Sequence, residues 1–195
     1  MEAIKYPSAT VRKETLHTLS LVTRYLRPNM HVLDVGCGAG YVSGEMARRP
    51  GIDVQSVDIV DCREVRTFPF KIFDGVSLPF AAASFDFVLL SFVLHHVPDE
   101  RKIPLLREVI RVSRAIVGLV EDTPESSFDY FVGHRHAERF RRRIHSTAGY
   151  GFLTRGEWLW LLRGLGLRIL EAQALGRFCR SLVQPFARTL MIAAR

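Results

Sequence analysis

The sequence predicts a single α/β domain with a mostly parallel sheet, and three observations support this prediction. A short apolar run at 31–35 opens into a loop with glycine at every second position, a pattern typical of a buried strand that turns into a helix. A second apolar run, 52–57, ends in Asp58, and further strand and helix patterns follow. The chain has 195 residues, 48% of them hydrophobic, which suits one domain over 1–195 and is too short for two of ordinary size.

In the first half of the chain, apolar residues at helical spacing predict an amphipathic helix from Val11 to Leu26, which we expect to cover the mouth of the sheet. The strand 31–35 is followed by a helix at 41–48 and by the strand 52–57. A third strand is expected near 70–73. The connection before it is too short for an ordinary crossover helix, so we expect an abbreviated link.

In the second half, strands are predicted at 85–90 and 115–120, with a helix between them that Asp99 caps and that carries Pro104 early. Thr154 and Glu157 form a capping-box pattern for a further helix, which bears both tryptophans of the chain. We interpret those tryptophans as core residues. The last two predicted strands are 168–174 and 187–193.

Between these parts, residues 121–153 show no buried strand pattern and are predicted to form a helical lid. The segment 134–143 holds five arginines and accounts for much of the net charge of +7. A local basic patch is a weaker indication of nucleic-acid binding than a basic fold would be.

The residues of the glycine loop argue against two common classes of nucleotide-binding loop. A dinucleotide fingerprint would place glycine at position 41, where Tyr41 stands, and the Gly-Lys-Ser/Thr signature of a phosphate loop does not occur.

The pattern Asp-x-Gly-x-Gly-x-Gly at 34–40 resembles motif I of the class I S-adenosylmethionine-dependent methyltransferases. Segments at 73–75, 84–88 and 91–97 are similar to later motifs of that family, in the expected order, and the last resembles the branch of quinone-biosynthesis methyltransferases. The resemblance covers roughly residues 30–120. It implies a Rossmann-like three-layer sandwich with a seven-stranded, mostly parallel sheet whose last strand is antiparallel.

The resemblance also implies S-adenosyl-L-methionine as cofactor. Asp58 would accept hydrogen bonds from the ribose hydroxyls, and Asp74 would lie at the adenine amino group. Asp34 would either order the glycine loop or reach the cofactor ammonium through water. The implied cofactor-binding residues are Asp34, Gly36, Gly38, Gly40, Asp58, Ile59, Asp74, Gly75 and Ser91.

His95 is the candidate catalytic residue, because the resemblance places the end of the fourth strand beside the methyl group and a histidine can take a proton from the acceptor. The alternative is that His95 only caps or packs. Candidate acceptor-binding residues are Glu121, His134, Arg139 and Arg142, and the arginines would select an anionic or electron-rich acceptor.

Three functions therefore stay open. The first is methyl transfer to an O, N or C centre of a small molecule. The second is RNA or protein methylation that uses the segment 134–143, although the strand end Ser91-Phe92-Val93-Leu94 lacks the Asn/Asp-Pro-Pro-aromatic pattern that clamps a nucleobase amino group, so nucleic acid is not the favoured partner. The third is a non-catalytic protein that keeps the cofactor pocket.

The remaining expectations are negative. Cys37, Cys62 and Cys179 form no Cys-x-x-Cys pair, so we expect no metal and full activity in the presence of a chelator. We expect no membrane span and no secretory signal, and hence a cytoplasmic protein. The oligomeric state is left open.

Overall fold

The computed structural model describes residues 8–131, 133–135, 151–175 and 187–195. Within them lies one sheet with the strand order β3-β2-β1-β4-β5-β7-β6. Its strands are β1 (Met30–Val35), β2 (Ile52–Asp58), β3 (Phe70–Ile72), β4 (Phe85–Ser91), β5 (Ser113–Asp122), β6 (Arg168–Ala174) and β7 (Arg188–Ala194). Only β7 runs antiparallel to its neighbours β5 and β6, which confirms the predicted seven-stranded sheet.

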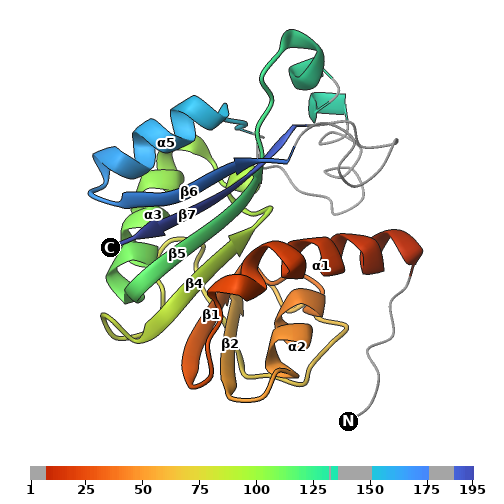
Figure 1. The fold of residues 1–195 in the computed structure, drawn as a ribbon, viewed down its shortest axis with the longest axis vertical. Helices are drawn as coiled ribbons and strands as arrows, with labels where there is room; N and C mark the ends of the chain where they lie inside the picture. The colour runs from red at the N-terminus through yellow and green to blue at the C-terminus, as the bar shows by residue number, and fades with distance from the viewer. Residues whose placement is uncertain (1–7, 132, 136–150, 176–186) are drawn as a thin grey trace.

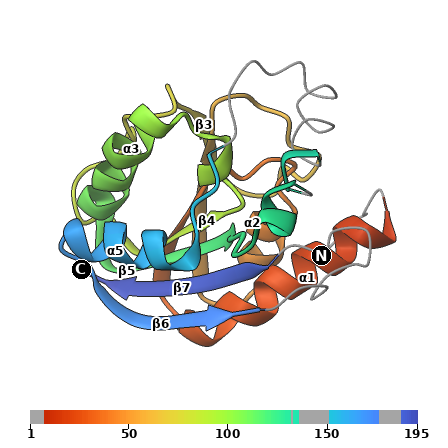
Figure 2. The same ribbon diagram turned by 90° about the horizontal axis from the view of Figure 1, so that it is seen from above.

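Helices cover both faces of this sheet (Figure 1). On one face lie α3 (Asp99–Val112) and α5 (Arg155–Gly164), and on the other lie α1 (Ala9–Val22) and α2 (Tyr41–Ala47), as the view from above also shows (Figure 2). Two 3-10 turns, η1 (Thr23–Tyr25) and η2 (Leu94–His96), follow α1 and β4. The three-layer sandwich predicted from the sequence is therefore confirmed.

The two cores follow from the alternation of side chains along each strand. In β5, Leu119 points to the α3 and α5 side, where it joins the fully buried Trp158 of α5. The next residue, Val120, points to the other face and packs with Val22 of α1. Because both faces are buried, the central strands read as nearly continuous apolar runs.

The second tryptophan departs from the prediction. Trp160 is 77% exposed, whereas Trp158 is 1% exposed, so the interpretation of both as core residues is wrong for Trp160. Residues two apart on a helix point about 200° away from one another, so only one of the two can face the sheet.

The beginning of α3 also differs from the prediction. The N-cap is Pro98, in an extended conformation, and Asp99 is the first helical residue and not the cap. Asp99 instead lies in the first turn, where a negative charge is favourable, and pairs with Lys102.

The connection between β2 and β3 contains no helix, as predicted. It folds back onto the glycine loop, because the backbone N–H groups of Glu64 and Val65 donate to the carbonyl of Ala39 at 2.9 and 3.1 Å. The Tyr41 hydroxyl donates to the Glu64 carboxylate at 2.5 Å. The short connection therefore holds the glycine loop in place from outside the sheet.

The predicted lid begins later than expected, since β5 continues to Asp122 and includes the first two residues of the range 121–153. Helical backbone occurs at 127–131 and 133–135, beyond the carboxyl end of β5 (Figure 1). Across the described ranges, no helix combines the length and apolar character that crossing a membrane would need.

Candidate functional site

The glycine loop after β1 lies at the carboxyl edge of the sheet, and its glycines have positive φ angles of +74° at Gly36, +52° at Gly38 and +84° at Gly40. A Cβ on Gly36 would stand 2.6 Å from the Val93 side chain, and one on Gly40 would stand 2.7 Å from the Val65 carbonyl oxygen. A Cβ on Gly38 would meet no protein atom within 4 Å among the described residues. Gly38 therefore faces open space, as a loop that approaches a ligand requires.

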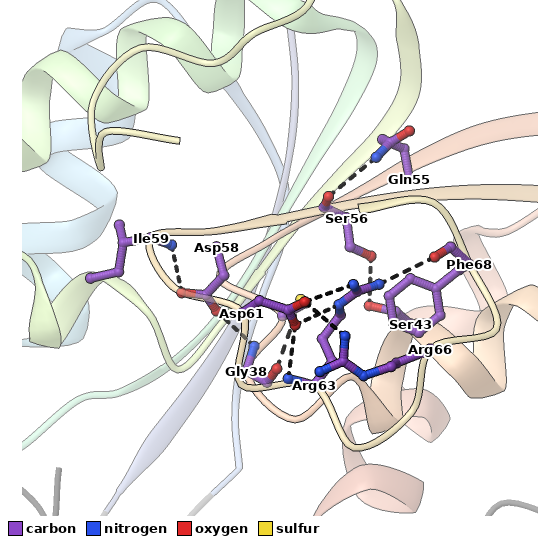
Figure 3. A network of polar contacts seen from close by, with 11 residues as sticks. Gly38, Ser43, Gln55, Ser56, Asp58, Ile59, Asp61, Arg63, Arg66 and Phe68 are labelled. Carbon is purple, nitrogen blue, oxygen red and sulfur yellow. Dashed lines mark hydrogen bonds and ion pairs between the residues drawn. The ribbon is translucent and has the colours of Figure 1, made fainter. Parts of the chain in front are cut away.

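Asp58, the last residue of β2, joins the next strand to this loop (Figure 3). One carboxylate oxygen accepts the N–H of Gly38 at 2.8 Å, and the other accepts the N–H of Ile59 at 2.7 Å. The side chain predicted to take the ribose hydroxyls thus also fixes the loop beside which the cofactor would lie.

Asp34 ends a buried polar chain at the base of the same loop. Its carboxylate accepts a hydrogen bond from the Ser43 hydroxyl, which in turn accepts one from Ser56 at 2.9 Å. Burial raises the pKa of Asp34, the hydrogen bond from Ser43 lowers it and the Asp58 charge raises it, and together they bring the pKa to about 6. Asp34 thus joins the end of β1 to Ser43 of α2, and it also lines the cavity described below.

Asp74 and Gly75 lie beyond β3, close to Asp58 and Ile59. The carbonyl of Asp58 accepts the N–H of Phe73 at 3.1 Å, and a Cβ on Gly75 would stand 3.3 Å from Ile59 Cγ2. Asp74 Oδ1 accepts the N–H groups of Val76 and Ser77, which lowers the pKa of Asp74. The four residues assigned to the adenosine half of the cofactor are thus brought together.

A cavity of about 150 Å³ opens on the other side of the glycine loop. Its wall combines Asp34, Gly36, Ser91 and Phe92 with one face of α1, which contributes Val11, Glu14, Thr15 and Thr18. Phe92 has a φ of +59°, a conformation that costs energy for a bulky residue and is concentrated at functional sites. The expected position of α1 at the mouth of the sheet is therefore observed, with the described polar side chains Glu14, Thr15 and Thr18 facing the cavity.

Glu121 of β5 is fully buried and holds the turn after β4. Its Oε1 accepts the N–H groups of Val93 at 3.0 Å and Leu94 at 2.7 Å, and its Oε2 lies 2.6 Å from His95 Nδ1. Burial lowers the pKa of His95, but the charge and hydrogen bond of Glu121, together with the charge of Asp122, outweigh this effect, and the pKa is raised. Glu121, predicted to contact the acceptor, is thus placed as the partner of the candidate catalytic histidine.

The described ends of the predicted lid segment contact His95 and one another. The His95 ring stacks on Phe152 with centroids 5.4 Å apart, and His134 meets the same phenylalanine edge-on at 5.8 Å. The N–H of Gly151 donates to the His95 carbonyl at 3.2 Å, and the buried Lys102 donates to the Gly151 carbonyl at 2.6 Å. The two described ends of the lid segment therefore converge on the candidate catalytic residue.

The structure also shows three contacts that the sequence did not predict. Lys102 donates to the Gly151 carbonyl, Phe152 stacks on His95, and Arg188 forms a buried ion pair with Asp122 at 2.6 Å. In each contact the two partners are far apart in the sequence, so no local pattern predicts it.

Arg139 and Arg142 lie outside the described residues, as does most of the basic segment 134–143. Within the part of the chain that the structure describes, no group of three or more His, Cys, Asp or Glu side chains is arranged to hold a metal ion. Whether turnover is independent of metal stays a prediction.

Comparison with known sequences places this geometry in a family. A model of the methyltransferase domain matches residues 9–172. The chain is 42% identical over 87 residues to the tRNA (carboxymethyluridine(34)-5-O)-methyltransferase alkbh8 of Xenopus tropicalis, a match that covers 43% of this chain and 14% of that protein. It is 37% identical over 93 residues to a demethylmenaquinone methyltransferase of Renibacterium salmoninarum, covering 45% of this chain and 38% of the relative. The chain therefore spans well under half the length of these curated relatives.

Among solved structures, a SAM-dependent methyltransferase of Methanosarcina mazei superposes with a TM-score of 0.67 at 22% identity, over 89% of this chain and 96% of the other. This likeness shows the shared fold. The family match covers most of the chain and confirms the resemblance drawn from the motifs, including S-adenosylmethionine as the methyl donor of the class. The chain belongs to the methyltransferase domain family.

Proposed function

We propose that this protein transfers a methyl group from S-adenosylmethionine to an O, N or C centre of a small-molecule acceptor. The observation that carries the proposal is the cavity at the carboxyl edge of the sheet, whose wall joins the glycine loop and Asp34 to the end of β4 and to α1. This edge is where open α/β sheets bind ligands. The cofactor's methionine half would lie there, and its adenosine half would lie over Asp58 and Asp74.

Methyl transfer from a sulfonium requires alignment and exclusion of water more than it requires acid-base chemistry. For an acceptor that is protonated at neutral pH, we propose His95 as the base, oriented by Glu121 through Nδ1. A purely structural role for the pair is the competing hypothesis, because Glu121 also holds the backbone of Val93 and Leu94.

A second candidate acceptor is RNA, because one relative is named a tRNA methyltransferase. The experiment that separates the two candidates supplies methyl-labelled S-adenosylmethionine with either a metabolite extract or total RNA. We expect label in the small-molecule fraction. Label that appears only in RNA would contradict the proposed acceptor class. Absence of transfer to either, with the cofactor still bound, would favour a non-catalytic role.

The pKa of Asp34 gives a stability prediction. Its value near 6, against an ordinary value near 4, means that its contribution to stability is complete below pH 4 and is lost as the pH rises through 6. Asp34→Asn should therefore gain stability relative to the wild type as the pH rises from 4 to 7.5, by up to about 3 kcal/mol for the shift of about two units. Urea unfolding of both proteins, without cofactor, at several pH values measures this difference.

The same residue links pH to cofactor binding. A cofactor ammonium near Asp34 favours the ionised carboxylate, so affinity for S-adenosylhomocysteine should rise between pH 5 and pH 7 in the wild type. In Asp34→Asn the affinity should change much less over this range. Calorimetry measures both affinities. If they change with pH to the same extent in the two proteins, Asp34 does not contact the cofactor ammonium.

Localisation in the cytoplasm, a single domain over 1–195 and a small molecule as the main partner stay predictions. The role of Arg139 and Arg142 in acceptor binding also stays a prediction.

A further inference from the structure

A second and larger cavity, of about 450 Å³, lies farther along the carboxyl edge of the sheet. It is bounded by the segment after β5, the first turn of α5, the end of β6 and the start of β7. Its volume falls in the range of small-molecule sites. The residues that the structure places in its wall are Thr123, Glu125, Arg155, Gly156, Leu159, Ala174, Ala187, Arg188 and Thr189.

Arg155 gives this cavity its chemical character. The guanidinium donates from Nη2 to the carbonyl of Ala172 at 2.8 Å, and its Nε is buried with no hydrogen-bond partner among the described residues. A buried donor without an acceptor is costly, and a guanidinium is suited to bind a carboxylate. Arg155 is thus a cation whose described protein contacts do not neutralise it.

The other charged side chains of the wall already have partners in the protein. Arg188 is almost fully buried and pairs with Asp122 at 2.6 Å. Glu125 accepts the backbone N–H of Arg155 at 2.9 Å, in the first turn of α5, where the helix dipole stabilises a negative charge. Arg155 is therefore the wall residue available to an anionic ligand.

The two cavities adjoin. The Arg188 guanidinium lies 5.1 Å from the ring centroid of Phe92, and Phe92 lines the cavity beside the glycine loop. Leu159 and Ala187 give the larger cavity apolar surface, and the hydroxyls of Thr123 and Thr189 bond to one another at 2.8 Å. The Arg188–Phe92 contact thus forms part of the wall between the two cavities.

We propose that this larger cavity binds the methyl acceptor and that Arg155 selects an acceptor with a carboxylate on an apolar body. The inference rests on the proposed function, because it takes the smaller cavity as the cofactor site. The carboxylate would accept hydrogen bonds from the guanidinium, while the apolar body lies against Leu159 and the alanines.

The test uses 2-naphthoate and its neutral analogue 2-naphthamide as probes, titrated into the full chain saturated with S-adenosylhomocysteine. We expect the carboxylate to bind about tenfold or more tightly than the amide. Arg155→Gln should reduce naphthoate affinity to that of the amide. Arg163→Gln, at an exposed position of the same helix, should leave it unchanged. In NMR spectra, the Arg155 Nε–H resonance should shift with naphthoate and not with naphthamide.

Equal affinities for the two probes in the wild type, or an unaffected Arg155→Gln variant, would overturn the proposal. So would naphthoate that displaces S-adenosylhomocysteine, because it would then occupy the cofactor cavity. If Arg155→Gln does not fold, Glu125→Gln provides the test. It removes a negative charge from the wall, so naphthoate should bind more tightly. Unchanged binding would contradict the proposal. A chain that binds no S-adenosylhomocysteine would fail the proposed function, and naphthoate titrated without cofactor still tests the cavity.

Discussion

Replacing Asp58 with alanine is expected to weaken binding of S-adenosylmethionine and S-adenosylhomocysteine by roughly 2–4 kcal/mol, or about 30- to 1,000-fold. Two effects combine. The ribose would lose two hydrogen bonds to a carboxylate, and the glycine loop would lose the acceptor that holds the N–H of Gly38. Isothermal titration calorimetry of the cofactor product measures the change.

The matched control is Asp53→Ala, which removes a carboxylate from the same strand. Asp53 pairs with His31 at the surface and lies away from the carboxyl edge of the sheet. Its loss should leave cofactor affinity unchanged. If both variants bind the product as tightly as the wild type, Asp58 does not contact the ribose.

Glu121→Gln is expected to lower the free energy of unfolding by about 2–4 kcal/mol, because it disrupts a fully buried charge pair. The amide keeps the shape of the side chain but has one acceptor oxygen in place of two for the N–H groups of Val93 and Leu94 and for His95. Urea unfolding measures the loss, with Glu100→Gln, an exposed residue in the first turn of α3, as control.

The pH dependence separates the charge from the hydrogen bonds. Because the pKa of His95 is raised in the folded protein, the pair's contribution is complete below the ordinary histidine value near 6.5 and is lost as the pH rises through the folded value. The difference between wild type and Glu121→Gln should therefore be larger at pH 6 than at pH 9. An NMR titration should also show a lower pKa for His95 in the variant. A pKa equal to that of the wild type would mean that Glu121 does not act on the imidazole.

Methyl-transfer assays then distinguish a base from a packing residue. If His95 takes a proton in the reaction, its loss should lower kcat and change the pH profile while cofactor affinity is kept. A variant whose loss of activity follows only its loss of stability would assign the pair to the structure of the turn.

The sequence alone determined the layered fold, and it predicted the cofactor-binding residues, because both depend on local patterns. Apolar runs that end in a glycine loop or in Asp58 specify buried parallel strands and the chemistry at their carboxyl ends. The capping box at Thr154 and Glu157 likewise needs only four residues, and both of its hydrogen bonds form. Such short patterns can be recognised without knowing which distant residues pack against them.

Only the tertiary structure decided the contacts between distant residues around His95, Asp122 and Arg155. Glu121 meets His95 because β4 and β5 are neighbours in the sheet, and Arg188 meets Asp122 because β7 inserts antiparallel beside β5. The orphaned donor of Arg155 arises from the packing of α5 against β6. The two ion pairs join residues that are 26 and 66 positions apart in the sequence. The unpaired donor of Arg155 depends on which groups are buried together. A local stretch of sequence predicts neither property.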